Sequence, residues 1–183
     1  MLHKILVYGL VAGMIVAVPM NAMLVALDGQ PPMTWGMAIG YTTMLIALST
    51  VFIAIKRHRD VELGGVIRFW PAFGLGIGIS VVAGIVYVAA WELAQAATGM
   101  DFASDYIRAL IEQERAKGAS AAELAKFTAG MEQFRRDYAN PLYRLPMTFS
   151  EIFPVGLLVS LVSAALLRNP RFMPARRAEV ATA

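Results

Sequence analysis

The stretch FWPAFGLGIGISVVAGIVYVAAW, residues 69–91, contains no charged side chain, and Glu92 follows it immediately. An α-helix rises about 1.5 Å per residue, so about 20 apolar residues cross the roughly 30 Å hydrocarbon core of a bilayer. The length and composition of this stretch therefore predict a transmembrane helix.

Three further stretches meet the same requirement. Residues 5–27 and 35–55 are uncharged, and residues 149–167 carry only Glu151, near their start. The first stretch also resembles a signal peptide, but its apolar run is longer than the usual run of about 7–15 residues, and Met20-Asn21-Ala22 is a poor cleavage site. We predict an all-α integral membrane protein with four transmembrane helices, formed by a single domain over residues 1–168.

The composition agrees with this fold class. Of the 183 residues, 58% are apolar and 16% are charged, whereas soluble domains are about 45–50% apolar and about 25% charged. The absence of cysteine excludes disulfide scaffolds, thiolate metal sites and cysteine nucleophiles. The two histidines lack the spacing of metal ligands or of a nucleophile–base pair. We therefore expect a protein that is not an enzyme and has no metal or cofactor.

The basic side chains are distributed unevenly among the connections between the predicted helices. Residues 28–34 contain none, and the long connection 93–148 contains seven that are balanced by seven acidic residues. Nine others flank the remaining helix ends: Lys4, Lys56, Arg57, Arg59, Arg68, Arg168, Arg171, Arg176 and Arg177. Because cytoplasmic loops collect Lys and Arg, we predict that both termini face the cytoplasm and that residues 93–148 lie outside.

The basic residues also have an expected second role, contact with anionic lipid head groups. Residues 169–183 are expected to form a basic, disordered cytoplasmic tail. Nucleic-acid binding is not expected, because no large basic patch with interleaved aromatic side chains occurs.

The long connection contains a predicted helical hairpin over residues 101–138. Residues 101–117 place their apolar side chains at helical spacing, and Gly118 can end a helix in the left-handed conformation. Ser120 and Glu123 have the spacing of a capping box, which begins a second helix. Its apolar stripe is a candidate interaction surface: Phe127, Met131, Phe134 and Tyr138. The alternative is a hairpin that closes only on itself.

Polar side chains near the outer membrane level form a second candidate site. Ionisable residues inside a membrane are costly and indicate function by default. Glu92 ends one predicted span, Glu151 begins the last one, and Asn21 lies in the same outer half, with Arg144 close by in the sequence. Two interpretations stay open. In the first, both carboxylates reach the head-group region, Glu151 lies at a helix N-terminus and Arg144 is a surface partner. In the second, the carboxylates line a polar cavity that binds a cation, a proton or a polar substrate.

Small residues indicate how the predicted helices pack. Glycine pairs at i and i+4 allow close approach of helices in lipid. They occur at 9/13, 36/40 and 74/78, and the pattern Phe73, Gly76, Ser80, Gly84 recurs as Phe153, Gly156, Ser160, Ala164. The pattern fits packing within one bundle or, alternatively, a homo-oligomer.

Two functions therefore remain open. The first is a non-enzymatic membrane protein that binds or scaffolds a membrane or periplasmic protein through the outer hairpin or through a packing face of the bundle. The second is a small carrier of an ion, a proton or a solute that uses Glu151 and Glu92.

Several segments resemble a known family. They are Tyr8-Gly-Leu-Val-Ala-Gly13, Lys56-Arg-His-Arg-Asp-Val-Glu-Leu-Gly-Gly65, Phe73-Gly-Leu-Gly76, Asn140-Pro-Leu142 and Glu151-Ile-Phe-Pro-Val-Gly156. In this order they are similar to the bacterial membrane family known as domain of unknown function 4199, over about residues 3–168. The resemblance implies four spans, a helical outer insert and a bacterial inner membrane. It implies no activity and no catalytic or binding residue.

Overall fold

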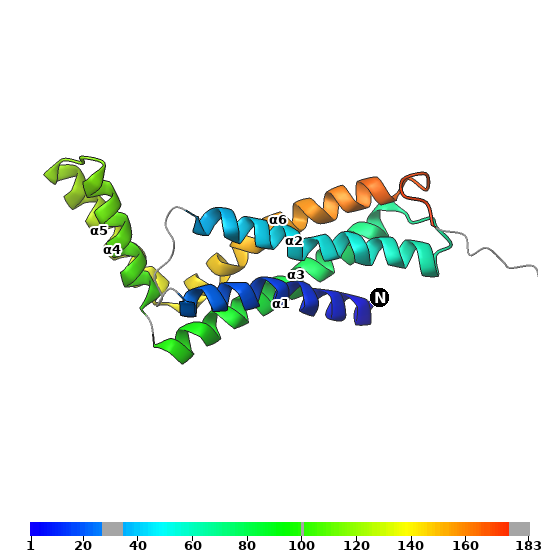
Figure 1. The fold of residues 1–183 in the computed structure, drawn as a ribbon, viewed down its shortest axis with the longest axis horizontal. Helices are drawn as coiled ribbons and strands as arrows, with labels where there is room; N and C mark the ends of the chain where they lie inside the picture. The colour runs from blue at the N-terminus through cyan, green and yellow to red at the C-terminus, as the bar shows by residue number, and fades with distance from the viewer. Residues whose placement is uncertain (27–34, 100, 176–183) are drawn as a thin grey trace, which may run out of the picture.

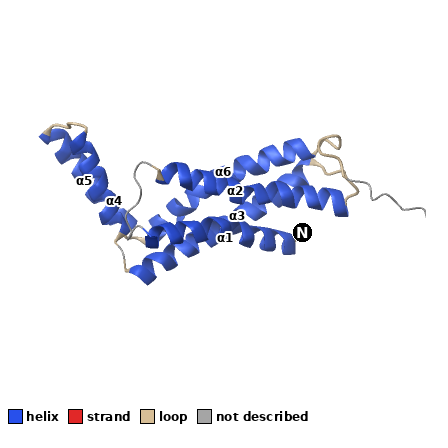
Figure 2. Cartoon of the chain, in the orientation of Figure 1, coloured by secondary structure: helices blue, strands red, loops and turns tan. Residues whose placement is uncertain are grey.

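The computed structural model describes residues 1–26, 35–99 and 101–175. Within these ranges it contains helices and no strand (Figure 2). The helices are α1 (Leu2–Ala26), α2 (Gly36–Arg57), the short π-helical turn η1 (His58–Glu62), α3 (Phe69–Thr98), α4 (Phe102–Ala116), α5 (Ala121–Tyr138) and α6 (Pro141–Leu167). Four described segments are long and apolar enough to cross a membrane: α1, α2 with η1, α3 and α6. The all-α fold class and the four candidate spans are thus confirmed.

The four long helices lie side by side in a bundle, and the α4–α5 hairpin leaves one end of it at an angle (Figure 1). Within the bundle α1 packs on α3, α3 on α6, α6 on α2 and α2 on α1. The N-terminus and the residues after α6 lie at the end opposite the hairpin. We call these the hairpin end and the terminal end of the bundle.

The bundle and the hairpin differ in how many large apolar side chains they expose. The bundle core contains fully buried residues such as Leu48, Ile55, Ile79 and Ile152. The large apolar side chains that stay exposed lie on the bundle helices and on the segments that flank them, and none of those described in α4 or α5 is exposed. Large exposed apolar side chains along four long helices are typical of a bundle whose outer face contacts lipid.

Small residues allow the bundle helices to approach closely. A Cβ atom added at Gly76 would lie 2.8 Å from Ser160, and one added at Gly156 would lie 2.6 Å from Ser80. The two serine hydroxyls are 3.3 Å apart. The repeated pattern on α3 and α6 is therefore one reciprocal contact between antiparallel helices. By contrast, Gly40 and Gly74, which belong to the other predicted pairs, have open space beside them, and Gly9 and Gly13 pack on α3.

The hairpin caps agree with the sequence. Gly118 has φ of 84°, and Ser120 and Glu123 form the expected reciprocal capping box. Asp101 adds an N-cap to α4, since its carboxylate accepts from the Ser104 backbone N–H.

Two boundaries differ from the prediction. α3 continues beyond residue 91 to Thr98, where Gly99 in the left-handed conformation ends it. α6 begins at Pro141 instead of residue 149, because the Asn140 side chain caps it and proline at the first position has no N–H to satisfy. The predicted limits were those of the apolar stretches, whereas the helices end where a capping residue stands.

The expectation of a disordered tail over residues 169–183 is wrong for its first part. Residues 169–173 form turns that fold back on the bundle, and Phe172 packs edge-on against Phe52 with ring centres 6.4 Å apart. The prediction also used residues 28–34 and 176–183, which lie outside the described residues.

Candidate functional site

At the hairpin end, Glu92 of α3 and Arg144 of α6 form an ion pair. Arg144 donates from Nε to Glu92 Oε1 at 2.7 Å and from Nη2 to Oε2 at 2.5 Å. The side chains are 29% and 19% exposed, respectively. Two parallel N–H···O bonds of this kind fix the relative orientation of both groups, so the pair ties the two helices together where their apolar stretches end.

Arg144 was predicted as a surface partner of the carboxylates at this level, and it pairs with Glu92. Glu151 takes no part in this ion pair. It accepts a hydrogen bond from the buried Tyr87 hydroxyl, with 2.9 Å between Oη and Oε2. Because α6 begins at Pro141, Glu151 lies well inside the helix and not in its first turn. The expected interaction of its charge with the helix N-terminus is therefore wrong, and its side chain stays exposed on the bundle flank.

Tyr138, at the end of α5, anchors the hairpin to the bundle. The Trp91 indole N–H donates to its hydroxyl at 2.9 Å, and the Arg144 guanidinium lies 5.7 Å from the centre of its ring. Phe102 of α4 packs edge-on against Trp91 with ring centres 4.7 Å apart. Burial raises the pKa of the Tyr138 phenol, so the hydroxyl stays neutral and accepts this bond.

The other predicted residues lie apart from this cluster. The Asn21 side chain donates to the Ala17 carbonyl of its own helix at 2.9 Å. Phe127, Met131 and Phe134 are half-buried on α5, whereas Tyr138 is buried and offers little surface to a partner.

The register of α3 against α6 explains which residues meet. The pairs Gly76–Ser160, Ser80–Gly156 and Glu92–Arg144 have residue numbers with the same sum, as antiparallel helices in fixed register require. The repeated small-residue pattern thus contained the signal that Glu92 lies opposite Arg144. Sequence reasoning used the pattern for packing only and did not extend it to the charged residues.

An open groove of about 590 Å³ lies beside this ion pair, between α3 and α6. Its walls are apolar and come from both helices, with Glu92 at its edge. We call it the α3–α6 groove; its lining includes Ile85, Val88, Ala89, Leu142, Leu145 and Phe149.

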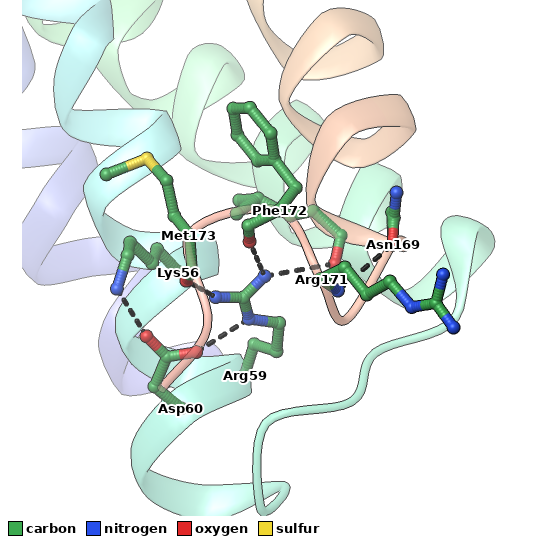
Figure 3. Close-up of polar contacts among 8 residues, drawn as sticks. Lys56, Arg59, Asp60, Asn169, Arg171, Phe172 and Met173 are labelled. Carbon is green, nitrogen blue, oxygen red and sulfur yellow. Dashed lines mark hydrogen bonds and ion pairs between the residues drawn. The ribbon is translucent and has the colours of Figure 1, made fainter. Parts of the chain in front are cut away.

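At the terminal end, Arg59 of η1 is completely buried among oxygen atoms (Figure 3). Nη1 donates to the Phe172 carbonyl at 2.9 Å and to that of Leu167 at 3.4 Å, and Nη2 donates to the Met173 carbonyl at 2.5 Å. Nε donates to Asp60 Oδ1 at 2.6 Å. Most of the guanidinium donors are therefore satisfied by this chain.

Neighbouring contacts complete the terminal end. Lys56 binds the second oxygen of Asp60 at 2.5 Å, and Lys4 of α1 pairs with Glu62 and lies 2.9 Å from His58 Nδ1. We call this set of contacts around η1 the terminal lock. It joins α1, α2 and the turn after α6, and it leaves little capacity for a ligand.

The sequence did not reveal the role of Arg59, which appeared only as one of several basic residues that orient the protein. Its acceptors are mostly backbone carbonyls, which any residue type supplies. The side-chain signals available for this set of contacts were two pairs at i and i+4, Lys56 with Asp60 and His58 with Glu62.

Within the described residues, no group of three or more His, Cys, Asp or Glu side chains is placed to hold a metal ion. The hairpin end thus offers an ion pair, one carboxylate with a tyrosine donor and an apolar groove. The terminal end offers a closed hydrogen-bond network.

Comparison with known proteins gives one match. Residues 7–169 match the family described as "Protein of unknown function (DUF4199)". No curated protein and no solved structure matches the chain.

Proposed function

Because the chain belongs to the DUF4199 family, which has no known function, we propose its role from its geometry alone. It is a non-enzymatic, multi-pass protein of the bacterial inner membrane that presents the α4–α5 hairpin to a partner protein. The observation that carries this proposal is the distribution of apolar surface. Exposed large apolar side chains occur along the bundle, whereas the hairpin has none among its described residues.

We call the α4–α5 hairpin the arm. The base of the arm is fixed, which suits a segment that binds a partner. Tyr138 and Phe102 contact Trp91 of α3, and Arg144 of α6 lies against the Tyr138 ring. Both hairpin helices are therefore held at the bundle, and an arm with a fixed base loses less conformational freedom on binding than a flexible one.

The surface of the arm fits a partner in water. Its exposed charges are of both signs and are paired along the helices, as in Arg115 with Glu112 and Arg135 with Glu132. Phe127, Met131 and Phe134 are half-buried and leave part of their surface accessible on α5. A small apolar centre with a charged rim is typical of interfaces between proteins that also exist separately.

The proposed orientation places both termini in the cytoplasm and the arm outside. Basic side chains gather at the terminal end, with Lys4, Arg57, Arg68 and Arg168 among them. The charges of the arm are balanced. The side with the excess of Lys and Arg faces the cytoplasm in multi-pass proteins.

Cysteine labelling tests the orientation, since the natural chain has no cysteine. Lys117→Cys places a thiol near the tip of the arm, and Arg171→Cys places one at the opposite end. In intact cells with a permeable outer membrane, we expect a membrane-impermeant maleimide to label only the Lys117 variant. Labelling of Arg171→Cys alone would reverse the orientation.

Photo-crosslinking tests the partner. A photoreactive amino acid at Lys126 on the arm should yield one discrete protein adduct in cells, whereas the same probe at Leu158 on the lipid face should not. Phe134→Ser should abolish the adduct, and its exposed neighbour Gln133→Ser should keep it. Loss of the adduct in both variants, or adducts at both probe positions, would contradict an arm with a specific binding face.

The second candidate function, a carrier, has one supporting observation. Glu151 is exposed on the flank of the bundle with one hydrogen bond from Tyr87, and it forms no ion pair with a described basic residue. Glu92 is already neutralised by Arg144, so this function would depend on Glu151. Proteoliposomes with Glu151→Gln should then lose a flux that the wild-type protein supports, at equal reconstitution.

A further inference from the structure

The α3–α6 groove spans the levels that a lipid molecule occupies, from the head group to part of an acyl chain. Glu92 is the first charged residue after the apolar stretch 69–91, so the Glu92–Arg144 pair lies at the head-group level. Ile85 and Val88 line the groove between this pair and the middle of the bundle, and Phe149 lines it on α6. Glu92 lines the groove, and Arg144 adjoins it through its ion pair with Glu92. The groove therefore extends from the carboxylate of this pair into the hydrocarbon region.

The ion pair retains hydrogen-bonding capacity on both of its members. Each Glu92 oxygen accepts one bond from Arg144, which leaves at least one lone pair on each. The Arg144 guanidinium has five N–H donors, of which two bind Glu92 and one makes a long contact of 3.4 Å with the Tyr138 carbonyl. The pair can thus accept from a cation and donate to an anion at the same time.

We propose that the α3–α6 groove binds one phosphatidylethanolamine molecule. The ammonium of its head group binds Glu92, its phosphate binds Arg144, and an acyl chain lies along the apolar walls. A zwitterionic head group complements the two charges of the pair, and its chain complements walls formed by residues such as Ala89 and Leu145.

The local charge balance selects against other lipids. The Glu92–Arg144 pair carries one charge of each sign. Glu151 lies about two turns further along α6, closer to the middle of the bundle, and adds only negative charge. An anionic head group would find no excess of positive charge. A choline head group carries no N–H, and its ammonium cannot donate to the free lone pairs of Glu92.

Native mass spectrometry of the delipidated protein in detergent tests the proposal. Phosphatidylethanolamine, phosphatidylglycerol and phosphatidylcholine with identical acyl chains are titrated separately and in competition. For the wild-type protein we expect one bound phosphatidylethanolamine, preferred over each other lipid by about tenfold, the factor given by one additional charge-assisted hydrogen bond. Equal or tighter binding of phosphatidylglycerol would overturn the proposal without any variant.

Three variants locate the site. Ala89→Trp fills the groove without changing a charge and should abolish the preferred binding, whereas Leu158→Trp, on another exposed face, should leave it intact. Glu92→Gln should remove the preference for phosphatidylethanolamine over phosphatidylcholine. Unchanged binding by a folded Ala89→Trp protein, or equal loss with Leu158→Trp, would show non-specific lipid and refute the site. The test is independent of the partner on the arm, because it uses the purified protein alone.

Discussion

Replacing Arg59 with methionine should open the terminal end of the bundle. The substitution removes the guanidinium while keeping a long apolar side chain. It leaves the carbonyls of Leu167, Phe172 and Met173 without their donor and removes one of the two basic partners of Asp60. The turn over residues 169–173 then keeps its local hydrogen bonds and the packing of Phe172 on Phe52.

The magnitude follows from these contacts. Removing one partner of a buried, hydrogen-bonded ion pair costs about 3–5 kcal/mol. Arg59 is completely buried, but Lys56 still binds Asp60, and the exposed Met173 allows water to reach its carbonyl. We therefore expect a loss at the lower limit, about 3 kcal/mol of unfolding free energy. Arg59→Lys should recover part of it, because an ammonium keeps the charge but cannot span all the acceptors.

Two assays measure the effect. Reversible unfolding in mixed detergent micelles gives the free energy, and the rate of trypsin cleavage after Arg168 and Arg171 reports the local opening of the turn. Arg57→Met is the matched control, since Arg57 lies two residues before Arg59 and its side chain is exposed. If Arg59→Met and Arg57→Met show the same unfolding free energy and cleavage rate, the terminal lock does not stabilise the fold.

Three further predictions concern other parts of the chain. Gly9→Leu should destabilise the bundle by about 1–3 kcal/mol in the same unfolding assay, because an added Cβ would lie 2.5 Å from a valine of α3; Gly74→Leu, with open space beside it, should not. Asp101→Ala should destabilise the hairpin by about 1 kcal/mol near neutral pH. Hydrogen bonds from Ser104 lower the pKa of Asp101. The contribution of the cap to stability is therefore present above the unfolded pKa of about 4 and disappears as pH falls through the lower folded value. Melting curves of the wild-type protein and the variant should converge in acid, and a constant difference would contradict the cap. Gln95→Leu should be neutral or stabilising by about 1 kcal/mol, because the buried Gln95 amide nitrogen has no hydrogen-bond partner in the described structure, and a clear loss of stability would reveal a partner.

Local signals in the sequence predicted the elements well. Long apolar stretches with at most one charged residue predicted the four candidate spans, since length and hydropathy alone decide whether a helix can cross a bilayer. Gly118 and the Ser120–Glu123 pair gave the turn of the hairpin, because these caps act through residues at most a few positions apart. Features that depend on residues close together in the sequence were therefore predicted correctly.

Non-local contacts were harder to predict. Arg144 was predicted as a partner of the nearby carboxylates without a choice between Glu92 and Glu151, because the register of α3 against α6 was not used. The structure pairs it with Glu92. The end of α3 and the start of α6 were predicted several residues too close to the middle of the bundle. Hydropathy marks only the apolar part of a helix, yet Glu92 and Arg144 pair with each other and both helices extend beyond the apolar stretches. Main-chain acceptors such as those of Arg59 give no signal in residue types at all.

The terminal lock also sets an order of events during synthesis. Arg59 precedes its carbonyl acceptors by 108 to 114 residues, so α2 and η1 are made long before the turn after α6 exists. An arginine without acceptors is costly away from water, and until then its guanidinium must stay solvated at the membrane surface. Contacts of such separation form late, because the intervening chain must first be ordered. Insertion of the last helix and withdrawal of this arginine from water are therefore coupled steps in the biogenesis of the protein.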